Sequence, residues 1–240
     1  MKKHKETKTY FVYGIHTVKA VLNYQPYRAK KLFITRKQDS EDLISLALNN
    51  HIDFEQIERN ELEHRFGVFS DAQGVVLTCS SFDYTSLESI LSKNPKKLLL
   101  LDSWQDSVNV GRAARASLAF GVDAIIMCKD RSVGVNAHAE KAAVGALSRI
   151  PIIRVTNLSS AIEILKKNNF FIYGASEEGK VLLDKCDFAD KTAIVIGQEG
   201  DGLRSLTKKQ CDVLVRIKSE NICLNAADSA MIFLYQLTIQ

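Results

Sequence analysis

A glycine-rich segment in the last quarter of the chain carries the residue types best suited to chemistry. It runs from Ala193 to Arg204 and reads AIVIGQEGDGLR. The apolar start predicts a buried strand that ends at Gly197, and glycines then alternate with polar residues. Glycine lets another molecule approach the backbone closely. Glu199 thus follows a strand at the end where open α/β sheets bind ligands, although a tight turn with a solvated glutamate explains this loop alone equally well.

Polar side chains follow two other predicted strands in the same manner. Asn109 and Arg115 come after the apolar run at 98–101, and Asn225 comes after a strand predicted at 213–217. Each residue has an ordinary explanation by itself, because asparagine often caps a helix and arginine often forms a surface ion pair. The carboxyl ends of parallel strands share one edge of a sheet, so these side chains are expected to converge.

The sequence lacks the motifs of several common protein classes. It has no legible Ser-His-Asp spacing, no GxxxxGK[ST], and no GxGxxG after the strand at 98–101. Its five cysteines are scattered without a CxxC pair, which predicts reduced thiols and no metal site. No apolar run approaches the roughly 20 residues that span a bilayer, and no apolar signal core follows the basic start. We therefore expect a cytoplasmic protein without membrane contact, and the net charge of +4 permits an RNA partner without requiring one.

The elements that must position these residues alternate between strands and helices. Residues 1–80 predict a small α/β domain, and residues 81–96, which contain a proline and many hydroxyl side chains, read as a linker. Residues 97–240 repeat strand–helix units, which predicts a parallel sheet covered on both faces. A last helix, at about 224–237, is apolar on nearly every side, and a subunit interface would bury it.

Three ordered motifs resemble those of the SpoU/TrmH family of RNA ribose 2′-O-methyltransferases, within the SPOUT superfamily. They are DSVNVGRAAR from Asp106, IVIGQEGDGL from Ile194, and Leu224 with Asn225 at the start of the last helix. The short segments YGIH and QGVV resemble the N-terminal substrate-binding domain of that family, which is similar to ribosomal protein L30e. Within the family, the chain most resembles the enzymes that methylate a guanosine ribose in 23S rRNA.

The resemblance implies an architecture and a set of partners. It implies a small N-terminal L30e-like α/β domain that binds RNA and a C-terminal parallel-sheet α/β domain whose end passes through a loop as a trefoil knot, a rare topology. It also implies a homodimer with the site at the interface, an RNA substrate (23S rRNA, with tRNA as the other candidate), and S-adenosyl-L-methionine as cofactor. The implied cofactor-binding residues are Gly197, Ile217, Leu224, Ala175 and Gly202.

The same resemblance implies catalytic roles for four residues. Arg115 matches the catalytic arginine of the family, Asn109 and Glu199 are expected to orient it and the substrate, and Asn225 is expected to brace the cofactor loop. A ribose hydroxyl is a poor nucleophile, so the oxygen, methyl carbon and sulfur must be held in line while the proton leaves. A guanidinium stays protonated. We therefore expect Arg115 to hold an RNA phosphate and stabilise the developing alkoxide rather than to act as a base.

The chain departs from the family pattern in its third motif. Residues 217–227 read IKSENICLNAA, a shorter loop in which Lys218, Cys223 and Ala227 stand where Pro, Ser and Ser are usual. In the first motif Ser107 replaces the usual Pro. The shortened loop motivates an alternative reading, an RNA-binding protein of the same fold with lost or weakened methyl transfer. An ordinary dehydrogenase is disfavoured because its glycine fingerprint is missing.

Overall fold

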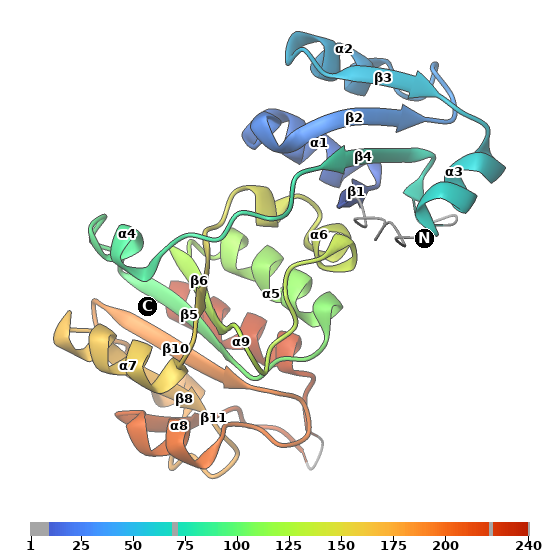
Figure 1. Cartoon of the computed structure of the whole chain (residues 1–240). Helices are drawn as coiled ribbons and strands as arrows, with labels where there is room; N and C mark the ends of the chain where they lie inside the picture. The colour runs from blue at the N-terminus through green and yellow to red at the C-terminus, as the bar shows by residue number, and fades with distance from the viewer. Residues whose placement is uncertain (1–9, 69–71, 221–222, 240) are drawn as a thin grey trace, which may run out of the picture.

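The computed structural model describes residues 10–68, 72–220 and 223–239, and these form two sheets on either side of the predicted linker (Figure 1). The N-terminal domain contains a sheet of strand order β1-β4-β2-β3, and the C-terminal domain contains a sheet of order β7-β6-β5-β10-β8-β11-β9. This confirms the predicted α/β class. The domain limits themselves stay a prediction.

The N-terminal sheet is mixed. β4 runs antiparallel to β1 and to β2, whereas β3 runs parallel to β2. The strands are β1 (Phe11–Tyr13), β2 (Ala29–Ile34), β3 (Asp53–Gln56) and β4 (Val75–Cys79). The helices are α1 (Ile15–Tyr24), α2 (Glu41–Asn49) and α3 (Arg59–Phe66). The apolar stripes of α1 and α2, which recur with helical periodicity, pack in one core with β2 and β4.

The C-terminal sheet is parallel at every strand pairing within the described residues. Its strands are β5 (Lys97–Asp102), β6 (Ala124–Cys128), β7 (Ile152–Val155), β8 (Phe171–Ala175), β9 (Val181–Leu182), β10 (Thr192–Gly197) and β11 (Val213–Arg216). Its helices are α4 (Leu87–Leu91), α5 (Ser107–Ala119), α6 (Ala137–Ala143), α7 (Leu158–Lys167), α8 (Ser205–Gln210) and α9 (Ala226–Thr238). β10 lies between β5 and β8, so the glycine-rich segment leaves the middle of the sheet.

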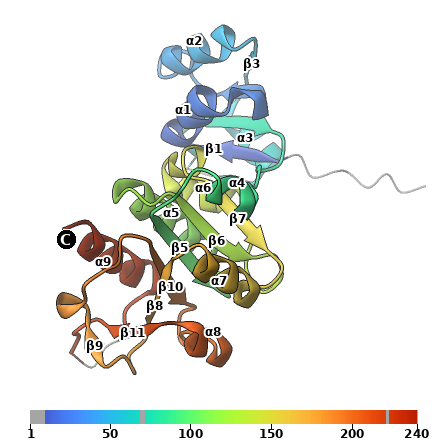
Figure 2. The same ribbon diagram turned by 90° about the vertical axis from the view of Figure 1, so that its left-hand side faces the viewer.

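Both faces of this sheet are covered, as predicted. Successive side chains of a strand point to opposite faces, and along β5 Leu99 and Leu101 join the core of α5, α6 and α9, whereas Leu98 and Leu100 join the core of α7. Figure 2 shows α9 and α7 on opposite sides of the sheet. β6 and β10 are buried along their whole length, which explains their unbroken apolar runs.

The last helix begins later than predicted, and its own chain leaves part of its apolar surface exposed. It begins at Ala226 rather than near residue 224, because the Asn225 side chain caps it by accepting a hydrogen bond from Ala227 N at 2.9 Å. It is also not enclosed by its own chain, since Met231 is 46% exposed and Tyr235 53% exposed. None of the described helices has both the length and the apolarity needed to cross a bilayer. The trefoil knot stays a prediction.

Candidate active site

Glu199 lies where three distant segments of the chain meet. Its Oε2 accepts hydrogen bonds from Asn109 Nδ2 on α5 at 3.3 Å and from Asn225 Nδ2 at the start of α9 at 2.9 Å. The Asn109 side chain is buried, whereas Glu199 is exposed. Glu199 therefore joins the loop after β10 to the helices that carry the first and third motifs. The structure brings together three of the four residues predicted to be catalytic.

Arg115 is the fourth, and it lies apart from the other three. It is exposed on α5 and has no hydrogen bond or ion pair to any residue that the structure describes. Arg115 comes six residues after Asn109, and at about 100° per residue the two side chains project about 120° apart around the helix. Its neighbour Arg112 instead pairs with Asp228 on α9, with 2.5 Å between Nη2 and Oδ1. The catalytic role of Arg115 stays a prediction.

The loop after β10 folds back on itself in a way that only glycine permits at its first position. A Cβ placed on Gly197 would lie 2.0 Å from the carbonyl carbon of Gly202. Gly202 N donates to Gln198 O at 3.0 Å, and Gly202 itself has a φ of +66°. Residues that carry a side chain rarely adopt that backbone conformation. The glycines thus make a tight turn that presents Glu199 beyond the sheet edge.

A buried aspartate that is not among the predicted site residues anchors the far end of this loop. Asp102 ends β5 and is fully buried. Its Oδ1 accepts from Arg204 Nε at 2.6 Å, and its Oδ2 accepts from Arg204 N at 3.2 Å. Ser103 Oγ also donates to Oδ1, at 3.1 Å. Two features of the sequence could have identified this pair. One is an acidic residue directly after an apolar run, and the other is an arginine at the end of the glycine-rich segment.

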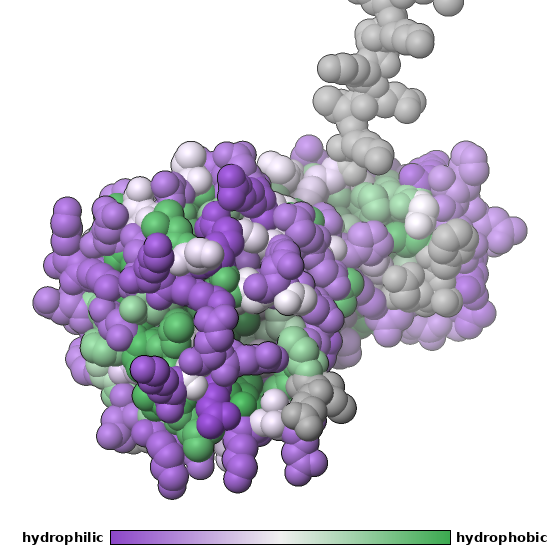
Figure 3. All heavy atoms as spheres, turned by 90° about the horizontal axis from the view of Figure 1, so that it is seen from below, coloured by the Kyte–Doolittle hydropathy of each residue, from purple (hydrophilic) through white to green (hydrophobic). Residues whose placement is uncertain are grey.

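A pocket of about 370 Å³ opens beside the loop. All five residues predicted to bind the cofactor line it, namely Gly197, Ile217, Leu224, Ala175 and Gly202. They come from the end of β8, the loop after β10, and the segment between β11 and α9. Figure 3 looks onto this end of the C-terminal domain, where apolar surface is exposed between hydrophilic side chains. The volume falls in the range of small-molecule sites, roughly 300–1,000 Å³.

The lining of this pocket is acidic. Its four carboxylates belong to Glu177, Glu178, Glu199 and Asp201. Lys208 is also in the lining and pairs with Glu178 at 2.9 Å. Desolvation, with Glu177 and Glu199 nearby, raises the pKa of the Cys223 thiol, so this thiol stays neutral. The excess of negative charge favours a ligand that carries positive charge.

A second pocket, of about 290 Å³, lies next to the first. Gln198, Glu199 and Ala226 line both pockets, and Trp104 and Asn109 line only the second. The Trp104 ring is buried, and its Nε1 donates to Ile196 O at 3.1 Å. This hydrogen bond joins the Trp104 side of the second pocket to β10. The two pockets therefore meet at these three shared residues. The described residues contain no group of three or more His, Cys, Asp or Glu side chains placed to hold a metal ion.

Comparison with known proteins gives matches over both domains. Residues 96–235 match the model of the SpoU rRNA Methylase family, and residues 11–85 match the model described as RNA 2′-O ribose methyltransferase substrate binding. The 23S rRNA (guanosine-2′-O-)-methyltransferase RlmB of Coxiella burnetii is 38% identical over 242 residues, 95% of each chain. RlmB of Escherichia coli K12 is 34% identical over 216 residues, 86% of this chain and 87% of that protein.

Solved structures share the fold at lower sequence identity. The SpoU methyltransferase AviRb from Streptomyces viridochromogenes, in complex with AdoMet, superposes with a TM-score of 0.80 at 19% identity and covers 97% of this chain and 90% of that one. An AdoMet-bound rRNA methyltransferase from Sinorhizobium meliloti has a TM-score of 0.81 at 20% identity, with 96% and 87% covered. These similarities confirm the predicted architecture of a parallel-sheet domain with a smaller N-terminal domain. The chain belongs to the SpoU rRNA methylase family.

Proposed function

We propose that this protein transfers a methyl group from S-adenosyl-L-methionine to a ribose 2′-hydroxyl of structured RNA, namely a guanosine of 23S rRNA. The observation that carries the proposal is the position of Glu199, which is held by Asn109 and Asn225 in the wall that two pockets share. A methyl transfer needs such an arrangement, with donor and acceptor held face to face. The family and the RlmB relatives support rRNA as the substrate class, and tRNA is the other RNA to be tested.

The residues of the larger pocket fit the cofactor. Its volume of about 370 Å³ suits a molecule of this size, and its four carboxylates complement the positive sulfonium and ammonium groups. Gly197, Ile217 and Leu224 would hold the adenine and ribose, largely through backbone groups. When bound, S-adenosylmethionine supplies a methyl group activated by its sulfonium.

The remaining polar residues of the site would act on the RNA. Asn109 and Glu199, which line the second pocket, would orient the 2′-hydroxyl, and Asn225, which donates a hydrogen bond to Glu199, would keep that carboxylate in position. Arg115 would bind the neighbouring RNA phosphate and stabilise the alkoxide as the proton leaves to phosphate or water.

A homodimer would account for the position of Arg115. The exposed apolar side chains Met231 and Tyr235 give α9 a face that its own chain leaves uncovered. The ion pair of Arg112 with Asp228 joins α5 to α9. A second copy of the chain bound to α9 would therefore also lie near the exposed Arg115 on α5. We propose that each protomer supplies Arg115 to the site of the other, in the cytoplasm where rRNA is modified.

The short third motif keeps the alternative of weakened methyl transfer open to experiment. Residues 221 and 222 of this motif lie outside the described residues. Ile217, Ser219, Cys223 and Leu224, on either side of them, all line the pocket. The remaining wall of the cofactor pocket is therefore present, which favours the active enzyme.

The proposal is tested by calorimetric titration with S-adenosylmethionine and by mapping 2′-O-methylation in rRNA and tRNA from cells with and without the protein. We expect micromolar cofactor binding and one guanosine of 23S rRNA that loses its methyl group when the protein is absent. Absence of binding at millimolar cofactor, with unchanged RNA methylation, would favour the RNA-binding alternative.

A further inference from the structure

A buried ion pair joins the two domains. Arg28 lies between α1 and β2 of the N-terminal domain, and Glu140 lies on α6 of the C-terminal domain. Arg28 Nη2 is 2.8 Å from Glu140 Oε1, and the two side chains are 0% and 1% exposed. The partners are 112 residues apart in sequence. This contact therefore depends on how one domain sits on the other.

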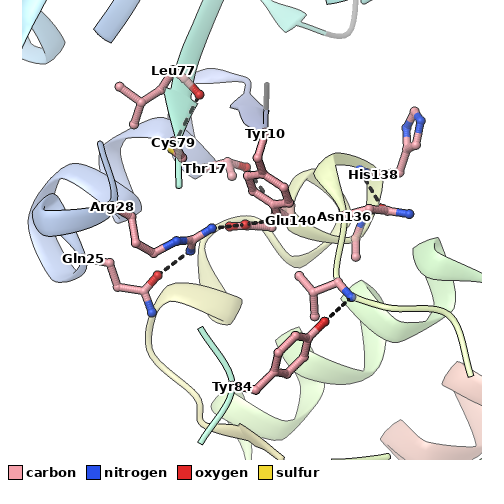
Figure 4. A network of polar contacts seen from close by, with 12 residues as sticks. Tyr10, Thr17, Gln25, Arg28, Leu77, Cys79, Tyr84, Asn136, His138 and Glu140 are labelled. Carbon is pink, nitrogen blue, oxygen red and sulfur yellow. Dashed lines mark hydrogen bonds and ion pairs between the residues drawn. The ribbon is translucent and has the colours of Figure 1, made fainter. Parts of the chain in front are cut away.

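Further side chains of the N-terminal domain hold the same glutamate (Figure 4). Tyr10 OH donates to Glu140 Oε1 at 2.7 Å, and Thr17 Oγ1 donates to the backbone oxygen of Glu140 at 3.3 Å. Burial, with Glu140 nearby, raises the pKa of the Tyr10 phenol, so this hydroxyl remains a donor. The Arg28 guanidinium also lies 5.0 Å from the ring centroid of Phe82, at the start of the predicted linker. Tyr10, Thr17 and Arg28 of the N-terminal domain thus all donate hydrogen bonds to Glu140 of the C-terminal domain.

The chemistry of this contact is better suited to fixing geometry than to adding stability. Burying two charges costs desolvation energy, and an apolar pair of similar size often stabilises a protein as well or better. Arg28 Nε and Glu140 Oε2 also lack partners among the described residues. A bond from a planar guanidinium to a carboxylate is directional, however, and allows few relative orientations of the domains that carry them.

Helix α6, which carries Glu140, packs closely on α5, the helix that carries Asn109 and Arg115. A Cβ placed on Gly111 of α5 would lie 2.3 Å from the backbone oxygen of Ala139 and 2.8 Å from Ala142 Cβ, both on α6. Gly111 lies between Asn109 and Arg115 in the same helix. The positions of these two residues are therefore tied through α6 to the N-terminal domain.

We infer that Arg28 and Glu140 are positioning residues that hold the RNA-binding domain in one orientation, so that RNA bound there presents its ribose beside Asn109 and Glu199. The inference rests on the proposed function for its RNA substrate. An RNA held by a loosely attached domain would sample many positions, and the fraction of productive encounters would fall.

Three variants of the full-length protein test this. Glu140→Gln removes one charge and keeps the size of the side chain, Tyr10→Phe removes only one donor, and the double variant Arg28→Met with Glu140→Gln leaves no unpaired buried charge. The exposed pair of Lys96 and Asp190 offers a matched control, Asp190→Asn, which breaks an ion pair away from the domain contact. For each variant, small-angle X-ray scattering, S-adenosylmethionine affinity, and kcat and KM for rRNA are measured.

We expect Glu140→Gln to lower kcat/KM for rRNA about tenfold, mainly by raising KM, and to increase the radius of gyration, while cofactor affinity stays within about twofold. Tyr10→Phe should show a smaller effect, and Asp190→Asn should behave as the wild type. If Glu140→Gln does not fold, the double variant carries the same expectation and Tyr10→Phe the smaller effect in the same direction.

Unchanged scattering together with unchanged KM for rRNA would overturn the inference. An equal loss of cofactor affinity would also overturn it, because these residues would then act on the C-terminal domain itself. If the wild-type protein transfers no methyl group to RNA, the proposed function fails, and scattering alone decides whether the ion pair fixes the domains.

Discussion

Substitutions at Asn225 separate the two roles that its side chain has in the structure. Oδ1 caps α9 by accepting from Ala227 N, and Nδ2 donates to Glu199 Oε2. Asn225→Ala removes both contacts. Asn225→Asp keeps a good cap, because aspartate and asparagine cap helices about equally well, but it places a second carboxylate against Glu199.

The expected magnitudes differ between stability and activity. Loss of a cap costs about 1 kcal/mol, so Asn225→Ala should lower the free energy of unfolding by roughly 1–2 kcal/mol once the exposed hydrogen bond to Glu199 is included. In Asn225→Asp two like charges about 4 Å apart repel by roughly 1 kcal/mol in water and about 4 kcal/mol near a protein surface. Since Glu199 is exposed, we expect about 1–2 kcal/mol at the site, or a roughly five- to thirtyfold slower reaction.

Thermal unfolding measures the effect on stability. The initial rate at which a tritiated methyl group is transferred to rRNA measures the effect on activity. We expect Asn225→Asp to keep the cap but to lose about 1–2 kcal/mol of unfolding free energy to the repulsion, and to slow methyl transfer about five- to thirtyfold. Asn157→Asp is the matched control, because Asn157 caps α7 in the same manner and contacts no site residue that the structure describes. Wild-type methyl transfer by Asn225→Asp would refute the role of the Glu199 contact.

Three other substitutions test neighbouring parts of the site. Arg115→Ala should abolish methyl transfer and leave the calorimetric affinity for S-adenosylmethionine within about threefold; joint loss of both would contradict its role on the RNA. Gly197→Ala should abolish cofactor binding, because the new Cβ would lie 2.0 Å from the Gly202 backbone, and retained binding would show that the loop can open. Asp102→Asn should lower the free energy of unfolding by about 2 kcal/mol, because it weakens the buried bond to a half-exposed Arg204, whereas a loss below about 0.5 kcal/mol would mean that this bond does not hold the loop.

Periodicity and glycine placement predicted much of the fold from local sequence. The unbroken apolar run of β10, stopped by Gly197, was recognisable because a central parallel strand is buried on both faces. The meeting of Asn109, Glu199 and Asn225 was also foreseeable, since each follows a parallel strand and those strands end at one edge of the sheet.

Other contacts between distant residues were decided only by the tertiary structure. The pairs Asp102 with Arg204 and Arg28 with Glu140 are 102 and 112 residues apart, and no local pattern marks them as partners. The surroundings of Arg115 depend on the direction in which it projects from α5 and on the surface that covers the exposed face of α9. The spacing of the motifs specifies neither of these.

The sequence by itself determined the alternation of strands and helices and the sheet edge at which the polar residues gather, because backbone propensity and hydrophobic periodicity act over a few residues. The packing of whole domains decided which buried charges pair, how the two pockets share Glu199, and how α6 links the N-terminal domain to α5, because burial and charge pairing depend on the complete three-dimensional surroundings of each side chain.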